Sequence, residues 1–171
     1  MKKVGLYMLL TVVSLAFAAC AGQGTSPTSG IYPERAHQLI AKHSGKCLDV
    51  SGVSTANGAN IIQYDCHGGS NQQWTLTNKG DGYYLAVAKH SGKCLDVSGV
   101  STANGTNIIQ YDCHGGSNQQ WKLIPKGQGY YMLTAKHSGK CLDVAGASMA
   151  NGVNIIQYDC HGGPNQLWKL K

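Results

Sequence analysis

The chain has 171 residues, of which 13% are charged and 42% are hydrophobic, and it contains 23 Gly, 7 Cys, 3 Trp and one Phe. This length fits one compact domain with a tail, and the composition excludes a disordered acidic or basic chain. The formal net charge is +6, and removal of the leader described next leaves +4. A field this weak does not indicate nucleic acid as a partner. Abundant Gly and few helix formers favour strands and turns.

Residues 1–19 have the pattern of a secretory signal peptide. Lysines at positions 2 and 3 precede a mostly apolar run over residues 4–19, which is short for a membrane span. Phe17-Ala18-Ala19-Cys20 resembles a bacterial lipobox, in which the cysteine becomes the lipidated first residue of the mature chain. We therefore expect lipidation of Cys20 and attachment to the envelope membrane. The alternative is plain secretion after cleavage behind Ala18. Residues 20–33, with the small polar stretch 21–30, then form a flexible tether to a domain over 34–171.

The domain is dominated by an internal repeat of 47 residues. The string AKHSGKCLDV begins at Ala41, Ala88 and Ala135, and the lobes cover about 41–87, 88–134 and 135–171. Three equal units without capping repeats are too few for a propeller or a solenoid, so we predict closed three-fold symmetry. The third unit ends three residues after Trp168, and residues 36–40 are expected to supply its missing strand. The chain ends should then be adjacent.

Six of the seven cysteines form three pairs, each 19 residues apart. In an exported chain these pairs predict disulfides, each stabilising the fold by roughly 3 kcal/mol through loop closure. A zinc site built from His43, Cys47, Cys66 and His67 is the competing interpretation, but the spacing lacks a short Cys-x2-Cys unit. We therefore expect no metal and no cofactor. The expected disulfides are Cys47–Cys66, Cys94–Cys113 and Cys141–Cys160.

Each lobe repeats Cys-Leu-Asp-Val and then Tyr-Asp-Cys-His-Gly-Gly-x-Asn-Gln-x-Trp, which resembles the ricin B-type lectin domain and the related family 13 carbohydrate-binding modules. The resemblance covers about residues 36–171 and implies an all-β fold, a β-trefoil of twelve strands with one shallow sugar pocket per lobe. It also implies roles in the first lobe. Asp49 accepts sugar hydroxyls, Tyr64 supports the ring, His67 and Asn71 add hydrogen bonds, and Gln72 orients its neighbours. The corresponding residues are Asp96, Tyr111, His114, Asn118 and Gln119 in the second lobe, and Asp143, Tyr158, His161, Asn165 and Gln166 in the third.

Several residues also have structural interpretations. We expect Trp74 and its two counterparts to be core residues rather than sugar platforms, and the Tyr83-Tyr84 and Tyr130-Tyr131 pairs to pack on strands. Asp65 and its counterparts are expected to be turn or strand-end acceptors, and His43 to be a turn residue. Asp49 is expected at the surface, so that its replacement by Ala should leave the fold intact.

These patterns indicate a non-catalytic lectin with up to three equivalent sites. Glycoside hydrolysis needs two carboxyl groups in different environments, whereas every acidic residue except Glu34 and Asp81 occurs in triplicate. The expected partners are glycans, with galactose- or xylose-type sugars as candidates, and we expect a monomer that binds no nucleic acid. The alternative is an exported protein-binding or inhibitory scaffold without sugar specificity.

Overall fold

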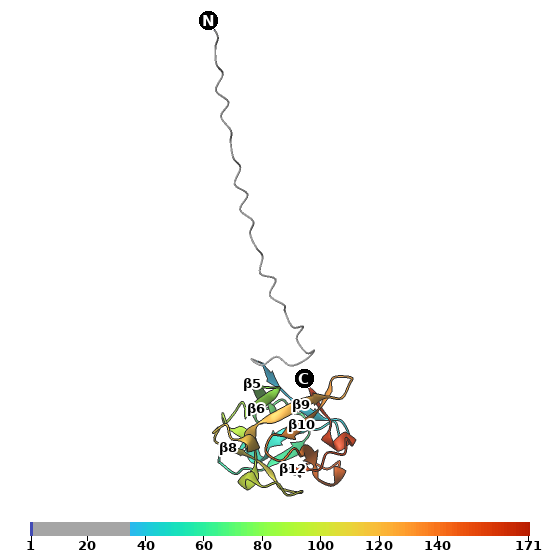
Figure 1. Ribbon diagram of the computed structural model, residues 1–171. Helices are drawn as coiled ribbons and strands as arrows, with labels where there is room; N and C mark the ends of the chain where they lie inside the picture. The colour runs from blue at the N-terminus through green and yellow to red at the C-terminus, as the bar shows by residue number, and fades with distance from the viewer. Residues whose placement is uncertain (2–34) are drawn as a thin grey trace.

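Thirteen strands form one continuous sheet in the computed structural model, which describes Met1 and residues 35–171 (Figure 1). The expected leader apart from Met1, the lipidation site at Cys20 and the whole tether over 20–33 lie outside the described residues. Among the described residues, no helix has the length and apolar character needed to cross a membrane.

Seven strands form a closed barrel. Two of them are short and follow one another along the same strand position, so the barrel is six strands around. The pairing runs from β1 through β5, β6, β9, β10 and β13 to β2, all antiparallel. This closure leaves the barrel without a free edge. The strands are β1 (Ala36–His37), β2 (Leu39–Ala41), β5 (Trp74–Gly80), β6 (Tyr83–Ala88), β9 (Trp121–Pro125), β10 (Tyr130–Ala135) and β13 (Trp168–Leu170).

Three two-stranded hairpins cap one end of the barrel, and each carries the repeated Cys-Leu-Asp-Val on its first strand. The hairpins contact one another through the β12–β4 pairing and through isolated bridges at Asn60↔Ile109 and Asn107↔Ile156. The three hairpins are β3 (Cys47–Val50) with β4 (Ile61–Tyr64), β7 (Cys94–Val97) with β8 (Ile108–Tyr111), and β11 (Cys141–Val144) with β12 (Val153–Tyr158). The predicted β-trefoil is thereby confirmed.

The two ends of the described domain meet at the open end of the barrel (Figure 1). β13 pairs with β2 in the register Trp168↔Ala41 to Leu170↔Leu39, which confirms that the N-terminal segment completes the third lobe. The strand is interrupted at Gln38, whose backbone N–H and C=O both bond to Lys171 at 3.0 and 3.1 Å. This interruption gives thirteen strands where twelve were expected.

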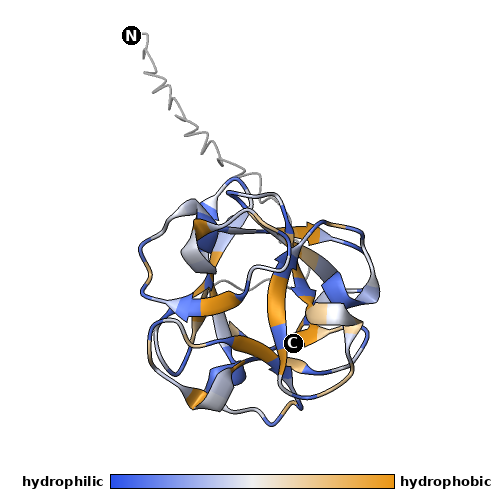
Figure 2. Cartoon of the chain, turned by 90° about the horizontal axis from the view of Figure 1, so that it is seen from below, coloured by the Kyte–Doolittle hydropathy of each residue, from blue (hydrophilic) through white to orange (hydrophobic). Residues whose placement is uncertain are grey.

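The core lies on the three-fold axis, where apolar strand residues from all lobes meet (Figure 2). Trp74, Trp121 and Trp168 are fully buried, and the indole N–H of Trp74 donates to the Leu48 carbonyl at 3.1 Å. The tryptophans are therefore core residues, as predicted, and offer no face to a ligand. Tyr84 and Tyr131 also pack against this core.

Hydrogen bonds between neighbouring lobes close a ring around the same axis. In the first lobe the Asp65 carboxylate accepts from Lys46 of its own lobe and, at 2.7 Å, from the Asn151 amide of the third lobe. His43 lies in a turn, as expected, but its Nε2 also reaches the Ser148 carbonyl of the third lobe at 3.0 Å. The other lobes repeat both contacts. Asp65 and its counterparts thus join lobes and act as acceptors.

Candidate functional site

Each lobe carries an open pocket between the cap hairpin, the short 3-10 turn that follows its first strand, and the loop behind the second cysteine. The cavity volumes are about 440 Å³ in the first lobe, 310 Å³ in the second and 330 Å³ in the third. The 3-10 turns on the rim are η1 (Ser51–Val53), η3 (Ser98–Val100) and η5 (Ala145–Ala147). Asp49, Tyr64, His67 and Asn71 all line the first pocket, and their counterparts line the other two.

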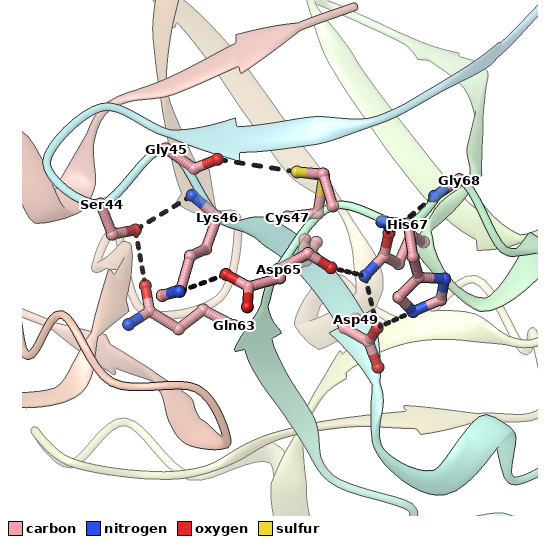
Figure 3. Close-up of a disulfide and its surroundings, with 12 residues drawn as sticks. Ser44, Gly45, Lys46, Cys47, Asp49, Gln63, Asp65, His67 and Gly68 are labelled. Carbon is pink, nitrogen blue, oxygen red and sulfur yellow. Dashed lines mark hydrogen bonds and ion pairs between the residues drawn. A yellow bond between two sulfur atoms is a disulfide. The ribbon is translucent and has the colours of Figure 1, made fainter.

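The carboxylate of Asp49 lines the first pocket, lies beside the His67 ring (Figure 3) and is held by two amides. The Asn71 Nδ2 donates to its Oδ1 at 3.0 Å, and the Gln72 Nε2 donates to its Oδ2 at 2.7 Å. Both amides come from the 3-10 turn η2 (Ser70–Gln72), and η4 (Ser117–Gln119) and η6 (Pro164–Gln166) supply them in the other lobes. Because an ionised carboxylate has about four acceptor positions, Asp49 keeps capacity for a ligand's hydroxyl groups.

The expectation that Asp49 is a surface carboxylate is wrong. Its exposed fraction is 4%, and those of Asp96 and Asp143 are both 3%. The sequence gives no sign of this, because an Asp between Leu and Val on a short strand can face either side. Its burial depends on the two amides of η2, which replace the water that an exposed carboxylate would bind.

Gln72 is fully buried and joins the strand to the loop. Its Oε1 accepts the backbone N–H groups of His67 and Gly68 at 2.9 and 3.3 Å, and its Nε2 also donates to the Asp65 carbonyl at 2.9 Å. All four hydrogen-bonding positions of this side chain are used within the protein. Gln72 therefore positions the pocket residues and does not face a ligand.

His67 stands beside the carboxylate with a defined proton position. Its Nδ1 accepts the backbone N–H of Gly69 at 3.1 Å, so the proton of the neutral ring lies on Nε2, which is 3.4 Å from Asp49 Oδ2. About half of the histidine side chain is exposed. The Nε2–H thus lies at the edge of the pocket on a long contact with Asp49, and a ligand oxygen there can share it.

Asn71 offers the pocket a hydrogen-bond acceptor, whereas His67 offers a donor. Its two amide hydrogens are used on Asp49 and on the Val50 carbonyl, the latter at 3.3 Å. The Oδ1 atom, which has no hydrogen-bond partner among the described residues, is left as an acceptor. The pocket therefore offers two acceptors and one donor within a few ångströms, a set suited to adjacent hydroxyl groups.

An apolar surface completes the pocket. The Tyr64 ring is 42% exposed, and its centroid lies 6.3 Å from that of His67 at an interplanar angle of 72°. The two rings therefore form a corner, with the polar groups of Asp49 and Asn71 beside it. Ile62 and Val53 line the same cavity.

Val53, Ile62 and their counterparts are pocket residues that sequence reasoning missed. Ile62 belongs to an apolar strand and was not separable from the core. Val53 has a φ of 53° and an exposed fraction of 56%, an uncommon combination for a β-branched side chain. The sequence feature that pointed to a role is the presence of the same residue, Val100, at the equivalent position of the second lobe.

The three pockets differ on their rims. The third lobe has Ala145 and Ala147 where the first has Ser51 and Val53, and both positions belong to the rim turns. The first pocket alone is also lined by a residue of another lobe, Gly152. The residues equivalent to Asp49, Tyr64, His67 and Asn71 are the same in all three lobes, so any difference in binding must arise from the rim, where the third lobe lacks both the serine hydroxyl and the valine side chain.

Electrostatics separate the two sets of aspartates. Burial raises the pKa of Asp49 above its ordinary value of 3.8, and the hydrogen bonds from Gln72, His67 and Asn71 oppose this only in part. The pKa values of Asp96 and Asp143 are raised for the same reason. The hydrogen bonds of Asp65 to Lys46 and Asn151 lower its pKa instead. The pocket carboxylates therefore take up protons first on acidification.

Three disulfides hold the loops that carry the pocket histidines, with the predicted pairing. The Cys47–Cys66, Cys94–Cys113 and Cys141–Cys160 bonds each join the first cap strand to the loop that carries the pocket histidine. They fix that loop from one side, while Gln72 fixes it from the other. The zinc interpretation fails in this structure, because the sulfur atoms that it needs as ligands are bonded to each other.

Comparison with known proteins agrees with this architecture. The profile of the ricin-type beta-trefoil lectin domain matches residues 35–168. The crystal structure of ThreeFoil, a designed three-fold symmetric protein, is 58% identical, covers 79% of this chain and 96% of its own, and has a TM-score of 0.78. An exo-beta-1,3-galactanase from Clostridium thermocellum, 1,3Gal43A, is 42% identical over 82% of this chain and 30% of its own, with a TM-score of 0.79. The Macrolepiota procera ricin B-like lectin, solved with lactose, has the same fold at 21% identity, with 82% and 97% coverage and a TM-score of 0.72.

Proposed function

The chain belongs to the ricin-type β-trefoil lectin family, and we propose that it is a non-catalytic carbohydrate-binding lectin with three sugar pockets. The observation that carries the proposal is the arrangement in each pocket of one exposed tyrosine ring beside a buried carboxylate, an amide oxygen and an imidazole N–H. A sugar ring has an apolar C–H face and adjacent hydroxyl groups, and this arrangement matches both.

The proposed sugar-contacting residues are those that keep a free face or a free polar atom. They are Asp49, Tyr64, His67 and Asn71 in the first lobe, with Gln72 as the residue that positions them. Galactose-type sugars are the first class to test, because the 42% identical galactanase is named for a galactose polymer. Xylose-type sugars are the second class.

We further propose that the protein acts outside the cytoplasm. Three disulfides form and persist in oxidising compartments, which supports export. The proposed organisation is a leader over 1–19, a lipid on Cys20, a tether over 20–33 and the lectin domain over 34–171. Labelling with palmitate in a bacterial host tests the anchor: the wild type should be labelled and Cys20→Ser should not, and a wild type without label would assign the protein to the soluble secreted class.

The test of sugar binding uses a glycan array followed by calorimetry on the variants Tyr64→Ala and Tyr64→Phe. Tyr64 is exposed and contributes little to the core, so both variants should fold. The Ala variant should lose one of three sites, because the apolar platform is gone, and the Phe variant should keep all three. A protein that binds no glycan but captures a protein from envelope extract would instead support the scaffold alternative.

A further inference from the structure

Charged side chains are distributed unevenly between the cap hairpins and the barrel. The cap and its loops carry all six triplicated aspartates but only three cations, Lys46, Lys93 and Lys140, each paired with one of those aspartates. The other nine cations of residues 35–171 lie on the barrel strands or directly beside them. Within those same residues, Asp81 is the one side-chain carboxylate on the barrel. The domain is therefore strongly dipolar, which its modest net charge conceals.

Four of the barrel cations gather at the open end. Three equivalent places lie at the end of the barrel opposite the cap: the β5–β6 turn, the β9–β10 turn and the point where the two ends of the domain meet (Figure 1). The three-fold repeat relates them to one another. They carry Lys79, Lys126, and Arg35 with Lys171, and all four side chains are exposed.

Four more lysines lie on the barrel wall in two clusters, each around a partly buried tyrosine ring. Lys122 and Lys136 stand over the Tyr83 ring at 5.4 and 4.9 Å from its centroid. A second cluster places Lys42 and Lys169 over Tyr130 at 5.1 and 5.9 Å. None of these lysines is paired with a carboxylate among residues 35–171. Tyrosine and lysine both combine an apolar body with a polar tip, which suits them to a boundary between water and lipid.

We propose that the open end of the barrel and the adjoining wall, which carry the four tip cations and the two lysine–tyrosine clusters, dock on a lipid bilayer that contains anionic lipids. Two observations favour a bilayer over a soluble polyanion. The chain enters the domain at this same end, so the apolar run at residues 4–19 or a lipid on Cys20 lies upstream of the basic surface. The clusters also pair each lysine with an aromatic ring, whereas a purely electrostatic surface needs charge alone.

Docking in this orientation would place the proposed sugar pockets on the side of the domain away from the membrane. The cap hairpins, with their excess of carboxylates, would be repelled by the anionic surface, and the pockets built on those hairpins would lie at the end away from it. This consequence rests on the proposed sugar binding, but the docking itself does not. An anchored chain would then present its sites outward without further structure in the tether.

The test uses residues 35–171, which contain every described strand, the core and the three disulfides; the similar ThreeFoil chain folds as such a domain alone. Sedimentation with phosphatidylcholine vesicles, with and without phosphatidylglycerol, measures binding. The domain should bind only the anionic vesicles, and salt should weaken this binding. Replacing Lys79, Lys122, Lys126 and Lys169 by Gln should lower the partition coefficient by almost three orders of magnitude, at about fivefold per lysine. The matched variant with Arg at all four positions should bind as the wild type does.

Three results would overturn the proposal: equal binding to neutral vesicles, unchanged binding by the Gln variant, or retention on dextran sulfate without any binding to vesicles. The last result would assign the surface to a soluble polyanion. Calorimetry with sugar on the Gln variant separates the two proposals, because the four lysines lie outside the pockets and sugar binding should be unchanged. Loss of vesicle binding with intact sugar binding therefore concerns the basic surface alone.

Discussion

The backbone N–H of Gly69 donates to Nδ1 of His67 at 3.1 Å and so decides which imidazole nitrogen carries the proton. The same bond is present at Gly116 and Gly163. Gly69 is also packed so closely that a Cβ atom there would lie 2.6 Å from His67 Cε1 and 2.7 Å from Asn71 Oδ1. Its φ is not in the left-handed region. The glycine is therefore required for the space that it leaves to the two polar groups of the pocket.

Gly69→Ala should accordingly remove one sugar site. The histidine ring and the Asn71 amide must move by several tenths of an ångström or more, which misplaces the donor and one acceptor, and calorimetry should show two sites per chain. In the His67→Ala background the larger clash is absent, so the additional effect of Gly69→Ala should be smaller. Three intact sites in the single variant would show that the pocket tolerates this displacement.

Asp49→Ala should destabilise the fold as well as remove a site. The substitution leaves the Asn71 and Gln72 amides without their acceptor in a buried position, and we expect a loss of about 3 kcal/mol in the free energy of unfolding. Denaturant unfolding of Asp49→Ala, Gln72→Ala and the double variant measures the coupling of the pair. Additive effects would contradict the bridging role assigned to this carboxylate. For the same reason, tyrosine variants test sugar binding more cleanly.

Sugar binding should fall on acidification before the fold is lost. Ionised Asp49 accepts hydroxyl groups, and its pKa is raised by burial, so binding should weaken at pH values above 3.8. A carboxyl group with a raised folded pKa contributes stability that is fully present below the unfolded pKa and is lost as the pH rises through the folded value. Protonation of the three pocket aspartates therefore does not itself unfold the protein.

In the lobe-joining aspartates Asp65, Asp112 and Asp159 the pKa is lowered, so their effect on stability depends on pH in the opposite direction. The pKa of Asp65 is lowered by its bonds to Lys46 and Asn151, so its stabilisation is present above the unfolded pKa and is lost as the pH falls through the folded value. Calorimetry and thermal melting over the same acid series should show binding lost first. Coincident loss of both would mean that the pocket carboxylates titrate no earlier than the lobe-joining ones. Asp65→Asn is the control, and it should change the melting profile in acid and leave the binding profile in place.

Each disulfide should contribute about 3 kcal/mol to the free energy of unfolding, since each closes a loop of similar length. The double variant Cys47→Ala, Cys66→Ala tests the first lobe, and Cys94→Ala, Cys113→Ala is its matched counterpart. Because Cys66 precedes His67, removing the bond should also loosen the pocket and weaken sugar binding in that lobe. Non-reduced peptide mapping of the wild type should recover only the three intra-lobe links among these six cysteines.

The repeat alone predicts most of this fold, because three near-identical units without caps leave closed symmetry as the simplest arrangement, and paired spacing predicts the disulfides. Burial of Asp49 was not predictable, since it depends on amides 22 and 23 residues away that fold back onto the strand. The inter-lobe role of Asn151 was equally hidden, because its partner belongs to another unit. Ile62 shows the general limit, as an apolar residue on a strand has the same pattern whether it faces the core or a pocket.

Val53 should be a position where stability and binding oppose each other. It is an exposed β-branched residue with a φ of 53°, in a region that disfavours such side chains by roughly 1–2 kcal/mol. Asn tolerates this conformation, so Val53→Asn should raise the free energy of unfolding by up to about 1 kcal/mol. Loss of the apolar rim opposite the tyrosine should weaken sugar binding in the first lobe. Ala147, which has no β-branch at a φ of 50°, provides the graded control: Ala147→Asn should change stability less. Thermal melting and calorimetry on both variants decide between this account and an inert rim, for which Val53→Asn would stabilise the fold and leave binding unchanged.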